Sequence, residues 1–215
     1  LMKTKYIVAR YNESIDWLNF ALDKTVIYNK GEKLNIPNEI LVPNVGRESE
    51  TYLRYIIDNY DNLPDICVFS QGYIKDHMTI RLYRVKPHLY LKQLAIEANG
   101  NIPEASDYRY HIRGDDYQKH ISWGINPKIG NQGGRGSPKK KEDHLKFKEW
   151  FIKNIKDKLP EKELFHYPFA LFAVKKEQIL KHSIEYYENL IKEVNWDVNP
   201  IEGHYFERSW YYIFN

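Results

Sequence analysis

The sequence contains a single cysteine, Cys67, and no apolar run long enough to cross a bilayer. One cysteine cannot form an intramolecular disulfide, which excludes the disulfide-stapled folds typical of small secreted domains. Because Cys67 lies inside an apolar run, we expect it to be a small buried side chain. No segment has the pattern of a secretory signal. We therefore expect a soluble, cytoplasmic protein with no membrane segment.

The chain also lacks a strong excess of charge of either sign. Its 32 Lys and Arg residues against 29 Asp and Glu residues leave a formal net charge of +3. Proteins that bind a phosphate backbone usually present a broad basic face, so no nucleic-acid partner is expected. The positive charge is local, in the Gly-rich and Lys-rich residues 133–141. A solvated basic loop is the ordinary interpretation, and nucleic-acid processing stays a minor alternative.

Aromatic residues are abundant, at 15% of 215 residues, with 18 Tyr and 5 Trp. They could form a stacking surface for sugars or bases, or they could be amphipathic members of the core. The second interpretation is the more ordinary one. A hydrophobic content of 42% is enough for one substantial core.

Apolar, β-branched runs alternate with amphipathic segments in the first third of the chain. Residues 6–9, 25–28 and 66–69 have the pattern of strands. Residues 14–22 and 48–60 have the pattern of helices between them. This order is typical of a parallel sheet with right-handed crossovers. The sequence therefore predicts an α/β fold with a central, mostly parallel sheet flanked by helices.

The second half of the chain is predicted to add mainly helices. Residues 99–138 are rich in Gly, Asn, Asp and Pro and are expected to form long loops around short strands. The other predicted elements are helices at 143–159 and 176–194, a strand at 169–174 and an aromatic helix at 206–214.

Polar residues follow the predicted strands at the point where each strand ends. Carboxyl ends of parallel strands meet at one edge of a sheet, where ligands bind. Arg10, Asn12 and Glu13 follow the first strand and could contact a base, a ribose or a phosphate, or could simply form a capped turn. Arg47 is predicted to lie at a helix start, where an anion is favoured, and could bind a diphosphate bidentately. The alternative is an ordinary helix start with Glu48 complementing the dipole.

Two further groups of residues could carry chemistry. Asp76 and His77 lie beyond the third strand and could bind a divalent metal together with His204, although a polar turn is a simpler explanation. Glu207 is expected to begin the terminal helix beneath an aromatic wall and could act as a general base. Helix-start electrostatics would explain Glu207 equally well.

Taken together, these segments resemble a family catalogued as a domain of unknown function, DUF3431. The order of elements resembles that of GT-A-type glycosyltransferases, and the match is weaker across residues 99–165. Size and Asn/Lys/Tyr-rich composition are also similar to the N-terminal glycosyltransferase domain of a chlorovirus protein that glycosylates the major capsid protein. The segments that carry the family resemblance are Ile7-Val8-Ala9-Arg10-Tyr11-Asn12-Glu13, Tyr28-Asn29-Lys30-Gly31, Pro43-Asn44-Val45-Gly46-Arg47-Glu48, Gln71-Gly72, Asp76-His77, Phe172-Ala173-Val174 and Glu207-Arg208 with Trp210.

The resemblance implies a single GT-A-like domain with a donor-binding half at 1–98 and an acceptor-binding half at 99–215. It implies transfer of a sugar from a UDP-sugar to a glycan or glycoprotein acceptor, with Mn²⁺ or another divalent cation. The chlorovirus similarity implies UDP-glucose as the donor and the host cytoplasm as the location. The residues implied to bind the nucleotide sugar are Ala9, Arg10, Tyr11, Asn12, Asn44, Arg47, Gln71 and Gly72.

The chain departs from the GT-A pattern at the metal-binding motif. An Asp-x-Asp sequence normally follows the strand that corresponds to residues 66–69, but Ser70-Gln71-Gly72 stands there. The nearest acid is Asp76. Either Asp76 and a histidine replace the motif, or no metal is needed. The first alternative predicts Asp76, His77 and His204 as metal ligands, and Asp76 and Glu207 are predicted as catalytic residues. The alternative is a nucleotide- or glycan-binding module with a GT-A-like fold and no catalysis, and the anomeric outcome stays open.

Overall fold

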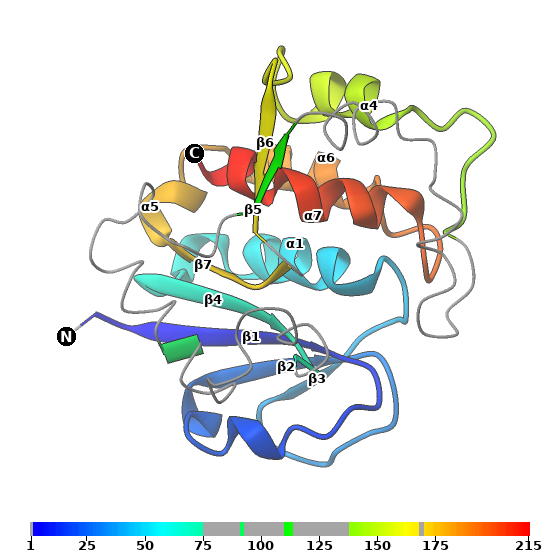
Figure 1. Ribbon diagram of the computed structural model, residues 1–215. Helices are drawn as coiled ribbons and strands as arrows, with labels where there is room; N and C mark the ends of the chain where they lie inside the picture. Colours follow the sequence, from blue (N-terminus) through cyan, green and yellow to red (C-terminus); the bar gives the residue numbers. More distant parts are fainter. Residues whose placement is uncertain (1, 75–90, 93–109, 114–137, 168–169) are drawn as a thin grey trace.

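The computed structural model describes residues 2–74, 91–92, 110–113, 138–167 and 170–215. Its largest element is a five-stranded sheet with the strand order β3-β2-β1-β4-β7 (Figure 1). The strands are β1 (Thr4–Arg10), β2 (Thr25–Asn29), β3 (Glu39–Leu41), β4 (Ile66–Gln71) and β7 (Phe172–Lys175).

Strand β1 lies in the middle of the sheet and is parallel to both of its neighbours. Ile7 is in register with Val26 of β2 on one side and with Phe69 of β4 on the other. Strand β3 is parallel to β2, and β7 is antiparallel to β4. The predicted α/β class with a mostly parallel sheet is therefore confirmed, as are the three strands expected in the first third of the chain.

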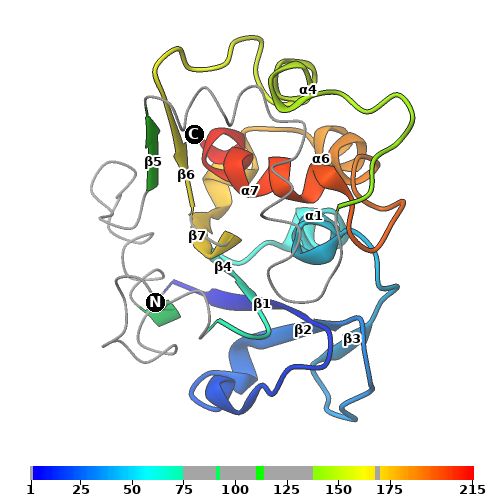
Figure 2. The ribbon, with the colours of Figure 1, turned by 45° about the vertical axis from the view of Figure 1, so that its right-hand side comes forward.

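Successive side chains of each central strand enter opposite faces of the sheet. In β1, Ile7 joins the large core on the helical face, whereas Val8 packs on the other face with Leu18 and Ile27. Helices α1, α6 and α7 cover the first face in both views (Figures 1 and 2). Their bounds are Arg47–Asp58, Ile184–Ile191 and Ile201–Phe214.

The prediction of a helix at residues 14–22 is wrong. Two short 3₁₀ turns, η1 (Asp16–Leu18) and η2 (Leu22–Lys24), take its place on the second face of the sheet. The Ser14 hydroxyl donates to the Asp16 carboxylate and accepts from the Asp16 N–H, and such local bonds compete with a helix. The indole N–H of Trp17 donates to the carbonyl of Gly72, 2.9 Å away, which ties the turns to the end of β4.

Three predicted helices differ in length from those observed. Residues 176–194 form two helices, α5 (Lys176–Ile179) and α6, because His182 between them bonds to the carbonyl of Ile213 and accepts from the Tyr60 hydroxyl. Helix α4 (Phe147–Asn154) is shorter than 143–159. Helix α7 begins at Ile201, so Glu207 lies within the helix and the prediction that it begins it is wrong. A second, two-stranded sheet pairs β5 (Tyr110–Arg113) with β6 (Glu163–His166).

Aromatic side chains form the centre of the core between the sheet and the helices. Phe172 lies 5.1 Å from Phe69 and 5.4 Å from Trp210, measured between ring centroids. Tyr52 of α1 contacts all three rings, and its hydroxyl donates to the carbonyl of Ala170. These aromatics are core residues, as the more ordinary interpretation of the composition expected. Among the residues described, no helix is long and apolar enough to span a membrane.

We expect the substitution Phe172→Ala to lower the free energy of unfolding by about 3–5 kcal/mol, because it removes a fully buried ring from this cluster. Leu41→Ala is the matched control, since Leu41 is 55% exposed on the edge strand and should change stability by less than about 0.5 kcal/mol. Urea unfolding followed by circular dichroism measures both values. Equal effects of the two substitutions would contradict the position assigned to the core.

Candidate functional site

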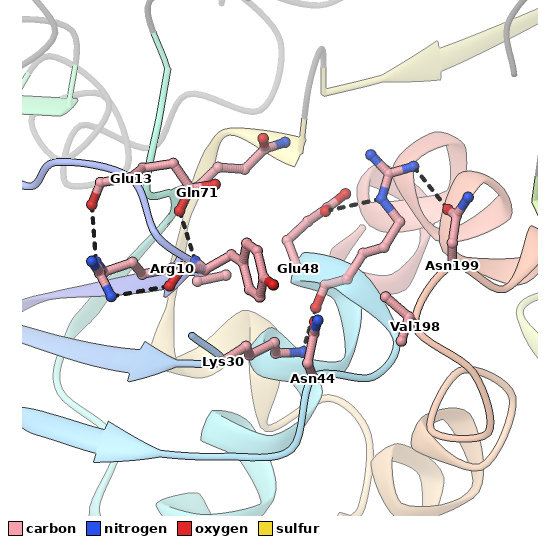
Figure 3. A pocket seen from close by; sticks show the side chains of 11 residues that line it. Arg10, Glu13, Lys30, Asn44, Glu48, Gln71, Val198 and Asn199 are labelled. Atoms are coloured by element: carbon pink, nitrogen blue, oxygen red, sulfur yellow. Dashed lines mark hydrogen bonds and ion pairs between the residues drawn. The ribbon is translucent and has the colours of Figure 1, made fainter. Parts of the chain in front are cut away.

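A cavity of about 290 Å³ opens at the carboxyl edge of the main sheet. In Figure 3, Arg10, Glu13 and Gln71 lie on one side of it, and Glu48 and Asn199 lie on the other. The cavity is lined by residues from the end of β1, the loops after β2 and β3, the start of α1, the end of β4 and the segment before α7. These residues are Ala9, Arg10, Tyr11, Glu13, Lys30, Asn44, Arg47, Glu48, Gln71, Val198 and Asn199.

The topology of the sheet explains why the cavity lies here. The chain leaves β1 toward β2 across one face of the sheet, and α1 returns from β3 to β4 across the other face (Figure 1). The connections that leave the carboxyl ends of β1 and β3 therefore pass to opposite faces of the sheet. Open α/β sheets bind ligands at such a divergence, because the loops leave a crevice between them.

Arg10 lines the cavity but its guanidinium is used to hold the surrounding loops. Its Nε donates to the carbonyl of Glu13 at 2.9 Å, and its Nη1 donates to Oδ1 of Asn29 at 2.8 Å. The same nitrogen lies within hydrogen-bond distance of the carbonyls of Tyr11 and Glu32. Arg10 is only 7% exposed. The described contacts therefore give Arg10 a role in fixing the loops after β1 and β2.

Lys30 also lines the cavity, and its ammonium group is engaged as well. It donates to Oε2 of Glu50 at 2.9 Å and to the carbonyls of Val45 and Arg47. The Lys30 and Glu50 side chains are 4% and 0% exposed. Arg54 pairs with the other oxygen of the Glu50 carboxylate. A buried carboxylate needs such partners, because a buried charge without them is strongly destabilising.

Arg47 is the third cation of the cavity wall, and its partners are weaker. Its Nη1 lies 3.1 Å from Nε2 of His204 and 3.4 Å from Oδ1 of Asn199, and both of these are neutral acceptors. The nearest carboxylate oxygen, on Glu48, is 3.7 Å from Nε. The side chain is 24% exposed. Of the three cations lining the cavity, Arg47 is the one best placed to exchange its present partners for an anion.

The imidazole of His204 is kept neutral by its surroundings. Burial and the neighbouring Arg47 lower the pKa of His204 to about 4, although Glu207 opposes the shift. Burial opposes ionisation of Glu207 as well, but Arg208, His166 and His204 lower the pKa of Glu207 to about 2. At neutral pH the pair therefore consists of a neutral imidazole and a fully ionised carboxylate.

The structure brings together most of the residues predicted to bind a nucleotide sugar. All of them line the cavity except Asn12 and Gly72. Asn12 accepts the Glu32 N–H on its side-chain oxygen, and the N–H of Gly72 donates to the carbonyl of Ala9. Asp76 and His77, predicted as metal ligands, lie outside the described residues.

The described residues do not supply a metal site by themselves. Within the described ranges, no group of three or more His, Cys, Asp or Glu side chains could hold a metal ion. His204 is the one predicted ligand that can be located, and its Nε2 faces the guanidinium of Arg47. In this arrangement that nitrogen accepts a hydrogen bond from a cation and is not available to a metal.

Sequence reasoning missed Lys30, Glu48, Val198 and Asn199 as parts of the cavity. Glu48 was considered only as a residue that complements the helix dipole. Lys30 follows β2 directly, so the strand-end rule applied to the second strand would have found it. Val198 and Asn199 carry no such signal. They reach the cavity because the carbonyl of Asn199 accepts the Lys139 N–H, and the Ile201 N–H donates to the carbonyl of Lys139.

Comparison with known proteins identifies the family. The family model described as "Protein of unknown function (DUF3431)" matches residues 6–215. The chain belongs to the DUF3431 family. The match includes residues 99–165, where the resemblance was expected to be weaker. No curated protein and no solved structure matches the DUF3431 chain significantly.

We expect His204 and Glu207 to make stability depend on pH in two separate windows. Because the folded-state pKa of His204 is about 4 and its ordinary value is 6.5, the unfolded chain binds more protons between these values. The contribution of neutral His204 is therefore complete above pH 6.5 and is lost as the pH falls to 4. For Glu207 the corresponding window runs from 4.5 down to about 2.

Urea unfolding across both windows measures these contributions. His204→Gln should reduce the slope of stability against pH between 6.5 and 4, and Glu207→Gln should reduce it below 4.5. An unchanged slope in the window of the substituted residue would contradict the assignment for that residue.

Proposed function

We propose that this protein is a glycosyltransferase that transfers a sugar from a nucleoside diphosphate sugar, with a UDP-sugar as the first candidate, to a glycan or glycoprotein acceptor. The observation that carries the proposal is the cavity at the carboxyl edge of β1 and β4, with the weakly paired Arg47 on its wall. Nucleotides bind at this place in open α/β sheets. A diphosphate is an anion that a guanidinium can grip with two parallel hydrogen bonds.

The other lining residues suit the uncharged parts of a nucleotide. Asn44, Gln71 and Asn199 present amide groups, which can donate and accept hydrogen bonds to a base or a ribose. Tyr11 and Val198 are 51% and 52% exposed and offer apolar surface for a base. A volume of about 290 Å³ lies near the lower end of the usual range for ligand pockets, about 300–1,000 Å³. We infer that it takes the nucleotide, with the sugar extending beyond it.

In sugar transfer, negative charge develops on the departing diphosphate. Arg47 would stabilise that charge, because a fixed cation is most effective where charge increases in the transition state. Glu207 is the predicted catalytic residue that can be located, and it does not line the cavity. A carboxylate with a pKa of about 2 is a weak base. We therefore propose that Glu207 does not deprotonate the acceptor. Its carboxylate instead acts as a fixed negative charge beside Arg208, whose Nη1 is 3.4 Å from Oε2 of Glu207.

The wall of the cavity combines both predicted halves of the chain. Val198 and Asn199 belong to residues 99–215, the half predicted to bind the acceptor, and they line the same cavity as the residues of the first half that were predicted to bind the donor. A divalent cation, Mn²⁺ in the first instance, remains part of the proposal through Asp76 and His77. Thermal shift with and without Mn²⁺ tests whether the cation contributes to nucleotide binding.

The first prediction is that one nucleoside diphosphate raises the melting temperature of the protein. A ligand that binds only the folded state stabilises it by mass action. UDP, GDP, CDP and dTDP are tested by thermal shift, each with and without Mn²⁺. We expect the largest shift with UDP, and a larger one with Mn²⁺ that is lost in Asp76→Ala. No shift with any nucleotide would contradict the proposed function.

The second prediction concerns Arg47. We expect Arg47→Ala to weaken UDP binding roughly tenfold or more, because charge-assisted hydrogen bonds contribute about 1.5–3 kcal/mol. Lys153→Ala is the matched control, since it removes one positive charge from an exposed position on α4, which does not line the cavity. Isothermal titration calorimetry measures both affinities. Equal losses would mean that only net charge matters.

Release of sugar or its transfer to an acceptor distinguishes the enzyme from the second candidate function. A nucleotide-binding module without catalysis is favoured by Ser70-Gln71-Gly72, which supplies no carboxylate at the end of β4. Tight UDP binding without consumption of any UDP-sugar would support that module.

A further inference from the structure

Arg47 has an unusual backbone conformation for a residue that is not glycine. Its φ is +52°, in the left-handed region that L-residues rarely adopt. Among the described residues that are not glycine, Asn35 and Ala170 share this property, with φ of +61° and +55°. Arg47 differs from both because it lines the cavity. The structure therefore maintains a strained backbone at the residue whose side chain carries the proposed function.

The preceding residue, Gly46, is also left-handed, with φ of +63°. A Cβ atom at Gly46 would lie 2.5 Å from Cβ of Glu50 and 2.8 Å from the carbonyl oxygen of Val194. The Gly46 N–H donates to the carbonyl of Asp197 at 2.7 Å. Two consecutive left-handed residues are thus enclosed between α1 and the segment that precedes α7.

Lys30 holds the chain on both sides of Gly46. Its ammonium donates to the carbonyl of Val45 and, at 2.6 Å, to the carbonyl of Arg47, and its third bond goes to Glu50. These partners account for the three donors of an ammonium group. A lysine on the wall of a cavity is usually taken for a phosphate ligand, but the present bonds leave Lys30 no donor for one.

We propose that Lys30 is a positioning residue: it holds the carbonyls of Val45 and Arg47, keeps the backbone of Arg47 left-handed, and thereby keeps the Arg47 guanidinium on the cavity wall for the donor diphosphate. Oε2 of Glu50 accepts a hydrogen bond from Lys30 and holds its ammonium group in place. Oε1 of Glu50 accepts a hydrogen bond from Nε of Arg54 at 2.6 Å. This inference rests on the proposed function for its ligand. The strained backbone and its attachment to Lys30 do not depend on that function.

The first test compares glycine with alanine at position 47, because both remove the side chain and only glycine adopts a positive φ without strain. We expect Arg47→Gly to unfold at a higher urea concentration than Arg47→Ala, which reverses the usual order for a helical residue. Asn35→Gly and Asn35→Ala are matched controls at a left-handed position that does not line the cavity. They should show the same order of stability and keep wild-type affinity for UDP.

The second test removes the attachment. In the double variant Lys30→Gln, Glu50→Gln, which removes both buried charges together, the advantage of glycine over alanine at position 47 should disappear. A general loss of stability would not change that advantage. An advantage of unchanged size would overturn the role of Lys30.

The third test is a double-mutant cycle on UDP affinity, or on affinity for whichever nucleoside diphosphate the wild-type protein binds. Lys30→Gln should weaken binding roughly fivefold or more when Arg47 is present and have no effect in an Arg47→Gly background. Equal effects in both backgrounds would mean that Lys30 contacts the ligand and would overturn the proposal.

Failure of this inference can be told apart from failure of the proposed function. Absence of nucleotide binding by the wild-type protein would overturn the proposed function and the assigned ligand. The stability order of glycine and alanine at position 47, measured with and without Lys30→Gln, Glu50→Gln, would still decide whether Lys30 holds a strained backbone. Normal nucleotide binding by Lys30→Gln would overturn the positioning role while leaving intact the proposed function, which depends on the cavity and on Arg47.

Discussion

Strand β1 pairs in parallel along both of its edges, with β2 through residues 6–10 and with β4 through residues 4–9. The carboxyl ends of three strands are therefore side by side, although their sequences are up to sixty residues apart. Every described lining residue of the first half of the chain reaches the cavity from one of these ends, from the loops that follow β1, β2 and β3, or from the start of α1. Helices α1, α6 and α7 stabilise the sheet because they bury the side chains on its helical face, among them Ile7 and Phe69.

Burying cations beside the cavity imposes a second constraint. A charge taken out of water must be paired or hydrogen-bonded, or the folded state loses stability. Arg10 and Lys30 meet this condition through backbone carbonyls and through Asn29 and Glu50. The main role of these two cations is therefore to hold the loops around the cavity, because their hydrogen-bond donors are already engaged by protein groups. Among the described cations that line the cavity, Arg47, with neutral acceptors as its closest partners, is the one that an anionic ligand can reach.

The strands and the position of the site could be predicted from sequence because they depend on local patterns. Apolar runs that end on polar residues mark β1, β2 and β4, and with them Arg10. The predicted helix start marks Arg47, and the family resemblance implied Asn44 and Gln71. The helix expected at 14–22 failed because Ser14 and Trp17 form specific contacts that a periodic pattern cannot reveal. The break at His182 depends on Ile213 and Tyr60, which are distant in sequence. For the same reason, no local signal pointed to Val198 or Asn199.

Because residues 197–201 form part of the cavity wall, the cavity can be completed only after this late segment of the chain has been synthesised. The carbonyl of Asp197 accepts the Gly46 N–H, and Lys139 pairs with the chain around Pro200. A chain still emerging from the ribosome can form β1, β2 and α1 long before this wall of the cavity exists. Contacts of such large sequence separation cost loop-closure entropy before they contribute stability. A ligand that contacts both Tyr11 and Asn199 would consequently connect the end of β1 to the segment before α7. After the ligand leaves, protein contacts alone would hold these two segments together.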